Sequence, residues 1–284
     1  MSRLITGLLF VVLFVGTAVA QLRPFGEFWN NLGYYDTNLE RKGFASLLGR
    51  FEGKVGLELF DSPLQVYGAY YATSSQSPDY WDNAVYCGPG VRFRPLAGYQ
   101  GSSWADEWLR DVKIFCESLN SSFLKNAVSG EANKRSDTRY GLDLWHEWNL
   151  ENPNQKYIWA ELWANYSHRS TNFTTSIYGP DFNGNILFFQ PKIGRHLGRG
   201  IEPYIKADIT VSDKPDYWLN VADYGLGIRF EPWRRDYPSG DSILKKFKMF
   251  AELLSVSYLK DKPTDPNLTV ERDARFGVEF SYGR

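Results

Sequence analysis

Charged and aromatic side chains recur at every second position in parts of this sequence, and they are the residues whose chemistry has to be explained. In IEPYIKADITV (201–211), Glu202, Tyr204, Lys206 and Asp208 alternate with mostly apolar residues. KYIWAELWANYS (156–167) alternates in the same way. A period of two predicts β-strands with one apolar and one polar face, and helical spacing fits neither segment.

The histidines offer little catalytic chemistry. His146, His168 and His196 are dispersed, and Ser167 points to the face opposite its neighbour His168, which is wrong for a dyad. The two cysteines are not in a ligand motif either. We therefore expect no enzyme activity, no metal and no cofactor, and we keep an outer-membrane hydrolase as a minor alternative.

The same alternation extends along most of the chain. Turn residues such as GRG and DKP separate the alternating segments. We predict twelve strands at 22–36, 43–60, 64–76, 81–95, 107–124, 136–151, 155–169, 184–197, 201–213, 217–233, 244–261 and 272–284.

An internal repeat organises these strands. The letters PDYW occur at 78–81 and at 215–218, and residues 66–96 align over 203–233. Near the start, Glu27 and Trp29 align with Glu161 and Trp163. The sequence therefore predicts two six-stranded repeat halves, about 21–152 and 153–284; two tandem β domains are the alternative.

The composition narrows the class of protein. Residues 1–20, MSRLITGLLFVVLFVGTAVA, are typical of a secretory signal peptide cleaved near Ala20, and residues 21–284 then form the folded part. The net charge of −1 gives no basic field for nucleic acid. Alternating strands and 17% aromatic residues favour an all-β, twelve-stranded antiparallel transmembrane barrel in a bacterial outer membrane, in contact with its lipids.

In such a barrel the polar face lines the interior. The predicted lumen-lining side chains carry both charges and several aromatic rings. They are Arg50, Glu52, Lys54, Glu58, Tyr67, Arg92, Lys113, Glu117, Arg139, Asp143, Glu161, Trp163, Tyr204, Lys206, Asp208, Arg229, Lys248, Glu252, Arg275 and Glu279. These side chains would line an open narrow channel, or they would close the lumen with ion pairs. A barrel of eight strands fills its own interior and one of sixteen or more leaves an aqueous pore, so twelve strands allow either outcome.

The two cysteines stand on either side of a turn centred near residue 101. Cys87 and Cys116 are expected roughly opposite each other on the outward face, where the oxidising periplasm favours a cross-strand disulfide. Two unpaired thiols are the alternative. Tyr224 and Ala251 occupy the aligned positions of the second half, so the fold does not require the bond.

Several runs resemble a known family. DTRYGLDLWHEWN (137–149), ELWANYSHRSTNF (161–173), PYIKAD (203–208) and NVADYGLGIRFEPW (220–233) are similar to the C-terminal barrel of NfrA-type phage-adsorption and exopolysaccharide-secretion proteins. The resemblance implies export of a surface polysaccharide and no catalytic residues. Those proteins usually carry a periplasmic helical-repeat region ahead of the barrel, so a separate partner would supply it here.

The functional expectation is a narrow polar channel or export component for a hydrophilic polymer, with exopolysaccharide as the favoured cargo. A small-solute porin, and a non-conducting structural or receptor barrel of the phage-adsorption type, are the alternatives.

Overall fold

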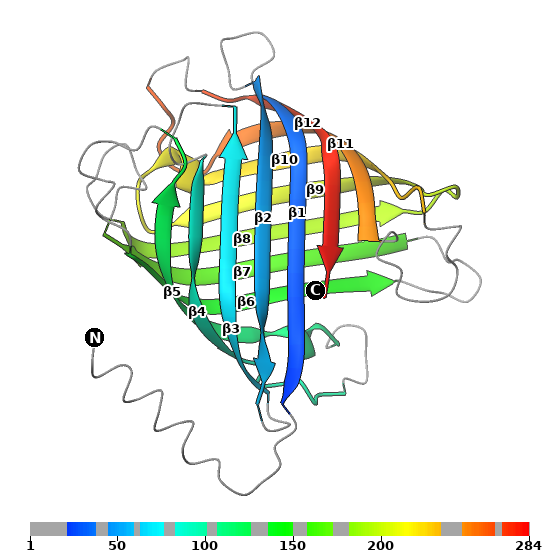
Figure 1. Ribbon diagram of the computed structural model, residues 1–284. Helices are drawn as coiled ribbons and strands as arrows, with labels where there is room; N and C mark the ends of the chain where they lie inside the picture. Colours follow the sequence, from blue (N-terminus) through cyan, green and yellow to red (C-terminus); the bar gives the residue numbers. More distant parts are fainter. Residues whose placement is uncertain are drawn as a thin grey trace, which may run out of the picture.

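The computed structural model describes residues 22–37, 45–59, 63–76, 83–100, 107–125, 136–149, 158–172, 182–233, 246–264 and 269–283. Its strands pair in sequence order, and the last strand pairs with the first, which closes an antiparallel barrel of twelve strands (Figure 1). The predicted signal peptide and the first PDYW copy lie outside the described residues.

The strands fall close to the predicted segments. Their bounds are β1 (Arg23–Thr37), β2 (Ala45–Glu58), β3 (Leu64–Ser75), β4 (Ala84–Phe93), β5 (Lys113–Phe123), β6 (Ser136–Asn149), β7 (Ile158–Thr171), β8 (Asn183–Arg195), β9 (Ile201–Ser212), β10 (Val221–Phe230), β11 (Phe247–Tyr258) and β12 (Arg272–Tyr282). The predicted twelve-stranded all-β fold is confirmed.

The two faces of the barrel wall differ in chemistry. Leu226, Leu253 and Phe276 are 66%, 59% and 58% exposed on the outward face, whereas Glu117 and Glu202 are each 1% exposed on the inward face. An apolar outside around a charged inside is the reverse of a water-soluble protein and is typical of a barrel that crosses a membrane. Within the described residues, no helix is both long and apolar enough to span a bilayer.

The interior of the barrel is narrow. In Figure 1, β1–β3 pass in front of β6–β9 and cross them steeply, because the strands of opposite walls tilt in opposite senses when viewed from one side. The ring centroids of Trp29 on β1 and Trp163 on β7 are 6.3 Å apart, although five strands separate β1 from β7 in either direction around the wall. Side chains from opposing walls therefore meet inside the barrel.

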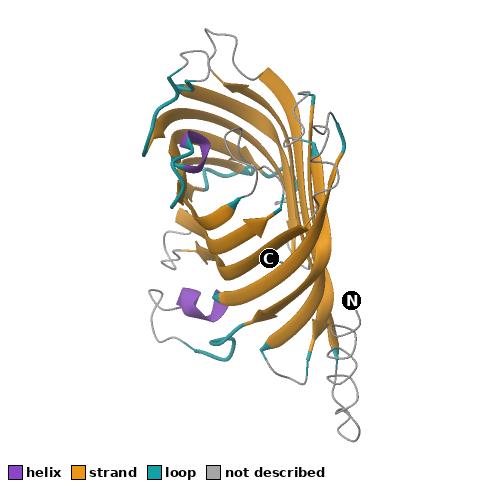
Figure 2. Ribbon diagram, turned by 90° about the vertical axis from the view of Figure 1, so that its left-hand side faces the viewer, coloured by secondary structure: helices purple, strands orange, loops and turns teal. Residues whose placement is uncertain are grey.

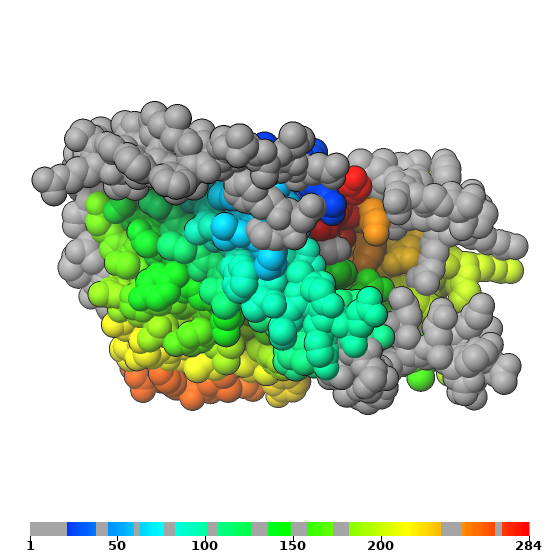
Figure 3. All heavy atoms as spheres, turned by 90° about the horizontal axis from the view of Figure 1, so that it is seen from below, coloured from blue at the N-terminus to red at the C-terminus, as the bar shows by residue number. Residues whose placement is uncertain are grey.

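Two short helical segments replace predicted strand residues (Figure 2). The prediction of strand from residue 107 is wrong, because Glu107–Asp111 forms the 3-10 helix η1, which packs against β6. The Asp111 carboxylate lies 2.6 Å from Nδ1 of His146, a buried residue of β6. Seen from below, the blue-green atoms of the residues after β4 gather near the centre of the view (Figure 3).

A buried asparagine closely follows the second PDYW copy. Tyr217 and Trp218 of this copy belong to the 3-10 helix η3 (Tyr217–Leu219), and Asn220 follows directly. The fully buried Asn220 amide accepts a hydrogen bond from the backbone N–H of Ser212 at 3.0 Å and donates to the backbone carbonyls of Lys214 and Asp216. This asparagine ties the start of β10 to the end of β9.

Candidate functional site

A two-armed ion pair across the first strands forms the first part of the lumen network. The Arg92 guanidinium donates to both carboxylate oxygens of Glu27, at 2.7 and 2.6 Å, and also to Gln65. Lys113 reaches the same carboxylate at 3.4 Å. Because Arg92 is 3% exposed, the pair is largely withdrawn from water.

The Glu117 carboxylate is the second centre of this network. The hydroxyls of Tyr67 and Tyr71 donate to it at 2.9 and 2.8 Å, and the Lys54 ammonium lies 3.8 Å away. Two phenols and one ammonium thus satisfy a carboxylate that is almost fully buried.

The later strands carry contacts of the same kind. Arg229 on β10 donates to Glu161 on β7 at 2.6 Å and to Glu202 on β9 at 2.8 Å. Lys192 and Lys248 lie 3.7 and 3.6 Å from the Glu161 carboxylate. All five strands from β7 to β11 therefore contribute to one cluster.

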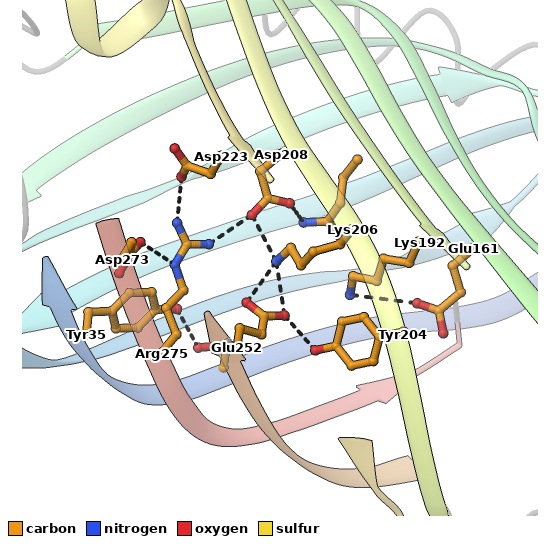
Figure 4. Close-up of polar contacts among 12 residues, drawn as sticks. Tyr35, Glu161, Lys192, Tyr204, Lys206, Asp208, Asp223, Glu252, Asp273 and Arg275 are labelled. Atoms are coloured by element: carbon orange, nitrogen blue, oxygen red, sulfur yellow. Dashed lines mark hydrogen bonds and ion pairs between the residues drawn. The ribbon is translucent and has the colours of Figure 1, made fainter. Parts of the chain in front are cut away.

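Glu252 on β11 is a further buried carboxylate that, like Glu117, accepts a hydrogen bond from a tyrosine hydroxyl. The Tyr204 hydroxyl donates to it at 2.6 Å, and the Lys206 ammonium lies 3.0 Å away (Figure 4). Lys206 also pairs with Asp208 at 2.9 Å. A phenol and an ammonium therefore both donate to this carboxylate.

Two glycines let the tyrosines reach these carboxylates. Gly90 stands directly opposite Tyr67 on the neighbouring strand, and Gly227 stands directly opposite Tyr204. A Cβ atom on Gly90 would lie 2.6 Å from the Tyr67 ring, and one on Gly227 would collide with the Tyr204 ring. Each ring lies over its glycine, so a larger residue there would displace the phenol.

Arg275 has three acidic partners. Its guanidinium nitrogens donate to Asp273 at 2.6 Å, to Asp208 at 2.8 Å and to Asp223 at 2.6 Å (Figure 4). The second oxygen of the Asp273 carboxylate is buried and has no hydrogen-bond partner in the described part of the chain. This cluster holds more negative than positive charge.

Arg139 occupies a different environment. Its guanidinium lies 4.9 and 5.2 Å from the ring centroids of Tyr71 and Tyr86, and it shares the Asp137 carboxylate with Arg169. Arg139 thus lies beside two tyrosine rings and shares one carboxylate, whereas Arg275 donates to three carboxylates. The two arginines differ in charge environment although each is bonded to an aspartate two residues earlier.

Two cavities in the lumen are lined by residues that the structure describes. The first cavity, of about 350 Å³, is lined by three basic and three acidic side chains together with aromatic and polar ones. The charged ones are Lys54, Arg139, Arg169, Glu52, Glu117 and Asp143. The second cavity, of about 240 Å³, is lined by five basic and five acidic side chains, Arg50, Lys192, Lys206, Lys248, Arg275, Glu161, Asp208, Asp223, Glu252 and Glu279.

Most of the lumen residues predicted from sequence line these cavities or belong to the ion-pair clusters. Trp163 lines both cavities. Glu58 shares the inward face of β2 by strand alternation but lies at its end, half-exposed, and joins neither cavity.

Several residues of the network are absent from the sequence-based set. These are Glu27, Gln65, Asp137, Arg169, Lys192, Glu202, Asp223 and Asp273. Signals in the sequence could have found two of them. Glu27 aligns with Glu161, which the prediction includes, and Glu202 lies on the same alternating face as Lys206.

The expected disulfide is not formed, since Cys87 and Cys116 are both free. They lie on the outward face as predicted, but the prediction that they are opposite each other is wrong. Cys87 pairs with Asn120 and Cys116 pairs with Val91. The turn between β4 and β5 is not centred on residue 101 as predicted. The residue opposite Cys87 is therefore Asn120, four residues along β5 from Cys116.

The three histidines lie apart, each beside a different partner. His146 contacts Asp111, His168 contacts Asn185 at 3.2 Å, and His196 contacts Glu202. Among the residues described, no group of three or more His, Cys, Asp and Glu side chains is placed to hold a metal ion.

No protein-family model matches the chain, and no curated protein sequence matches it. Solved structures do resemble it. The NanC porin aligns with a TM-score of 0.45 at 10% identity, over 89% of this chain and 98% of the porin. The KdgM porin gives 0.39 and 9%, over 90% and 99%. A bacterial polysaccharide outer membrane secretin gives 0.40 and 11%, over 92% and 98%.

Proposed function

We propose that this protein is an outer-membrane channel that passes a hydrophilic solute through a narrow, ion-paired lumen. One observation carries the proposal: buried charges and two polar cavities lie inside a closed barrel whose outward face is apolar. A bilayer accepts such a wall because strand pairing satisfies the backbone polar groups and closure leaves no edge.

A flexible polymer passing in single file is the cargo that we favour, with exopolysaccharide as its chemical class. The Trp29–Trp163 approach limits the width of the lumen, which suits a thin chain more than a bulky solute. Hydroxyl-rich chains find donors and acceptors along the network, and aromatic rings offer apolar faces. We also propose that the protein belongs to the NfrA-type family and that a separate periplasmic helical-repeat protein is its partner.

We also propose that the barrel is built from two six-stranded repeats. Matched contacts support this reading. Arg92–Glu27 and Arg229–Glu161 are ion pairs of the same kind, and Tyr67–Glu117 and Tyr204–Glu252 are hydrogen bonds of the same kind. The buried amide oxygen of Asn83 accepts from the N–H of Ser75, as that of Asn220 accepts from Ser212.

Planar-bilayer recording of the refolded protein tests the channel. We expect small ohmic steps in the wild type. Arg229→Ala leaves Glu161 and Glu202 without their guanidinium partner, so the steps should persist and shift toward cation selectivity. Arg195→Ala is the matched control, because Arg195 ends β8 on the opposite face.

The alternatives predict different recordings. Large steps that pass many small solutes without preference would favour a small-solute porin. Correctly folded protein that changes mobility on heating but never conducts would contradict the channel, and a structural or receptor barrel would then account for the fold.

A further inference from the structure

Three aromatic side chains separate the two cavities of the lumen. Trp163 and Phe188 line both cavities, and Trp29 lines the second. The ring centroids of Trp163 and Phe188 are 4.7 Å apart in an edge-on arrangement, and Trp29 faces Trp163 at 6.3 Å. We call Trp29, Trp163 and Phe188 the aromatic partition.

From this geometry we infer that the aromatic partition is a stacking site for uncharged sugar rings, at the point where the polymer passes from one cavity to the other. The inference rests on the proposed channel function and adds to it a location and a chemical class of ligand.

The position of the central ring is fixed. The Trp163 indole N–H donates to Asp143 at 3.2 Å, and the Asn165 amide donates to the same carboxylate oxygen at 3.2 Å. β1, β7 and β8 supply the three rings, so the partition joins both sides of the barrel. A ring held by its edge keeps its faces in a constant orientation, and a sugar ring can stack on such a face through its C–H groups.

The charge balance of the cavities indicates an uncharged ligand. The second cavity has five basic and five acidic side chains, and the first has three of each. Four of the five cations of the second cavity are already paired with carboxylates: Lys192 and Lys248 with Glu161, Lys206 with Glu252, and Arg275 with three aspartates. An acidic glycan would meet as many carboxylates as cations and would have to break these pairs, whereas hydroxyl groups can share their hydrogen bonds.

Isothermal titration calorimetry of the whole refolded protein in detergent micelles tests the site, because it needs no conduction. The probes are maltohexaose, which is uncharged, and a hexamer of galacturonic acid. We expect maltohexaose to bind and the acidic hexamer to bind at least about tenfold more weakly. Trp163→Ala should weaken maltohexaose binding about tenfold, the scale of one aromatic contact, and Trp163→Phe should keep most of it.

Trp218→Ala is the control for the loss of any indole, since Trp218 lies in η3 at the end of the strands. Equal or tighter binding of the acidic hexamer would overturn the charge argument. An unchanged Kd in a folded Trp163→Ala variant would overturn the stacking site. Sugar binding without conductance would refute the channel and support the stacking site. Conductance without sugar binding would support the channel and refute the stacking site.

Discussion

Arg92 and Glu27 form a two-armed ion pair although their strands, β4 and β1, are separated by β2 and β3. The concave inner face of the sheet brings the two side chains together over the intervening strands. The Arg92 charge therefore depends for its neutralisation on a residue 65 positions away in sequence.

Removing one member of this pair should destabilise the barrel. Glu27→Gln leaves the buried Arg92 guanidinium without its carboxylate, and the free energy of unfolding should fall by about 3 kcal/mol. Urea unfolding of the refolded protein in lipid vesicles, followed by tryptophan fluorescence, measures the change. Adding Arg92→Gln should recover part of the loss, because only the Lys113 ammonium then lacks the Glu27 carboxylate.

Glu58→Gln is the matched control for this experiment. Like Glu27 on β1, Glu58 at the end of β2 faces inward, but among the described residues it has no ion pair. Its change should stay within about 0.5 kcal/mol. A Glu27→Gln barrel as stable as the Glu58→Gln barrel would show that lumen water replaces the ion pair.

Gly90→Ala should be destabilising through Tyr67. The added methyl group would lie 2.6 Å from the Tyr67 ring, so the ring must move away from Glu117, and we expect a loss of about 1–3 kcal/mol. The midpoint of guanidinium unfolding measures it. Gly68→Ala is the control, since its methyl group would meet its nearest atom at 4.0 Å. The loss should shrink in a Tyr67→Ala background, where the two changes are coupled.

Arg275→Gln and Arg139→Gln should have unequal effects. The first leaves three carboxylates without their shared guanidinium, whereas the second leaves Asp137 bonded to Arg169 at 2.7 Å. We expect Arg275→Gln to cost about 2 kcal/mol more than Arg139→Gln. It should also shift the reversal potential further toward cation selectivity in a salt gradient. Equal shifts in both variants would contradict the proposed charge difference.

The two cysteines should resist intramolecular oxidation. Four residues of offset along the strands correspond to about 13 Å, too far for a disulfide. Mass spectrometry after alkylation should find two free thiols even after treatment with an oxidant. In a Cys116→Ala, Asn120→Cys variant the second thiol lies directly opposite Cys87, and oxidation should join them. A bond between the native pair would refute the register.

Strand alternation was the most informative property of the sequence. It placed Glu202, Tyr204 and Lys206 on one face of β9, and the burial of these side chains agrees. Pairing across the lumen could not be predicted in this way, because alternation gives the face of a residue but not the strand that it meets over the curvature of the sheet. The Arg92–Glu27 pair is an example.

Register was the least predictable property. The connection between β4 and β5 contains η1, and its turn is not centred where the prediction placed it. Cys116 therefore lies opposite Val91 and not opposite Cys87. The unequal surroundings of Arg139 and Arg275 were equally hidden, since both follow an aspartate by two residues. Their difference arises from Tyr71 and Tyr86 on one side and from Asp208 and Asp223 on the other.

The spacing between ion-pair partners also constrains how the protein is made. Glu27 on β1 meets Arg92 only once β4 is in place, and Lys113 only once β5 has been added. Until then, a nascent sheet holds unneutralised charges on its concave side, which hydrocarbon would not accept. The inner surface must therefore stay wet while the outer surface enters the lipid. Premature burial of that side would stall insertion before closure.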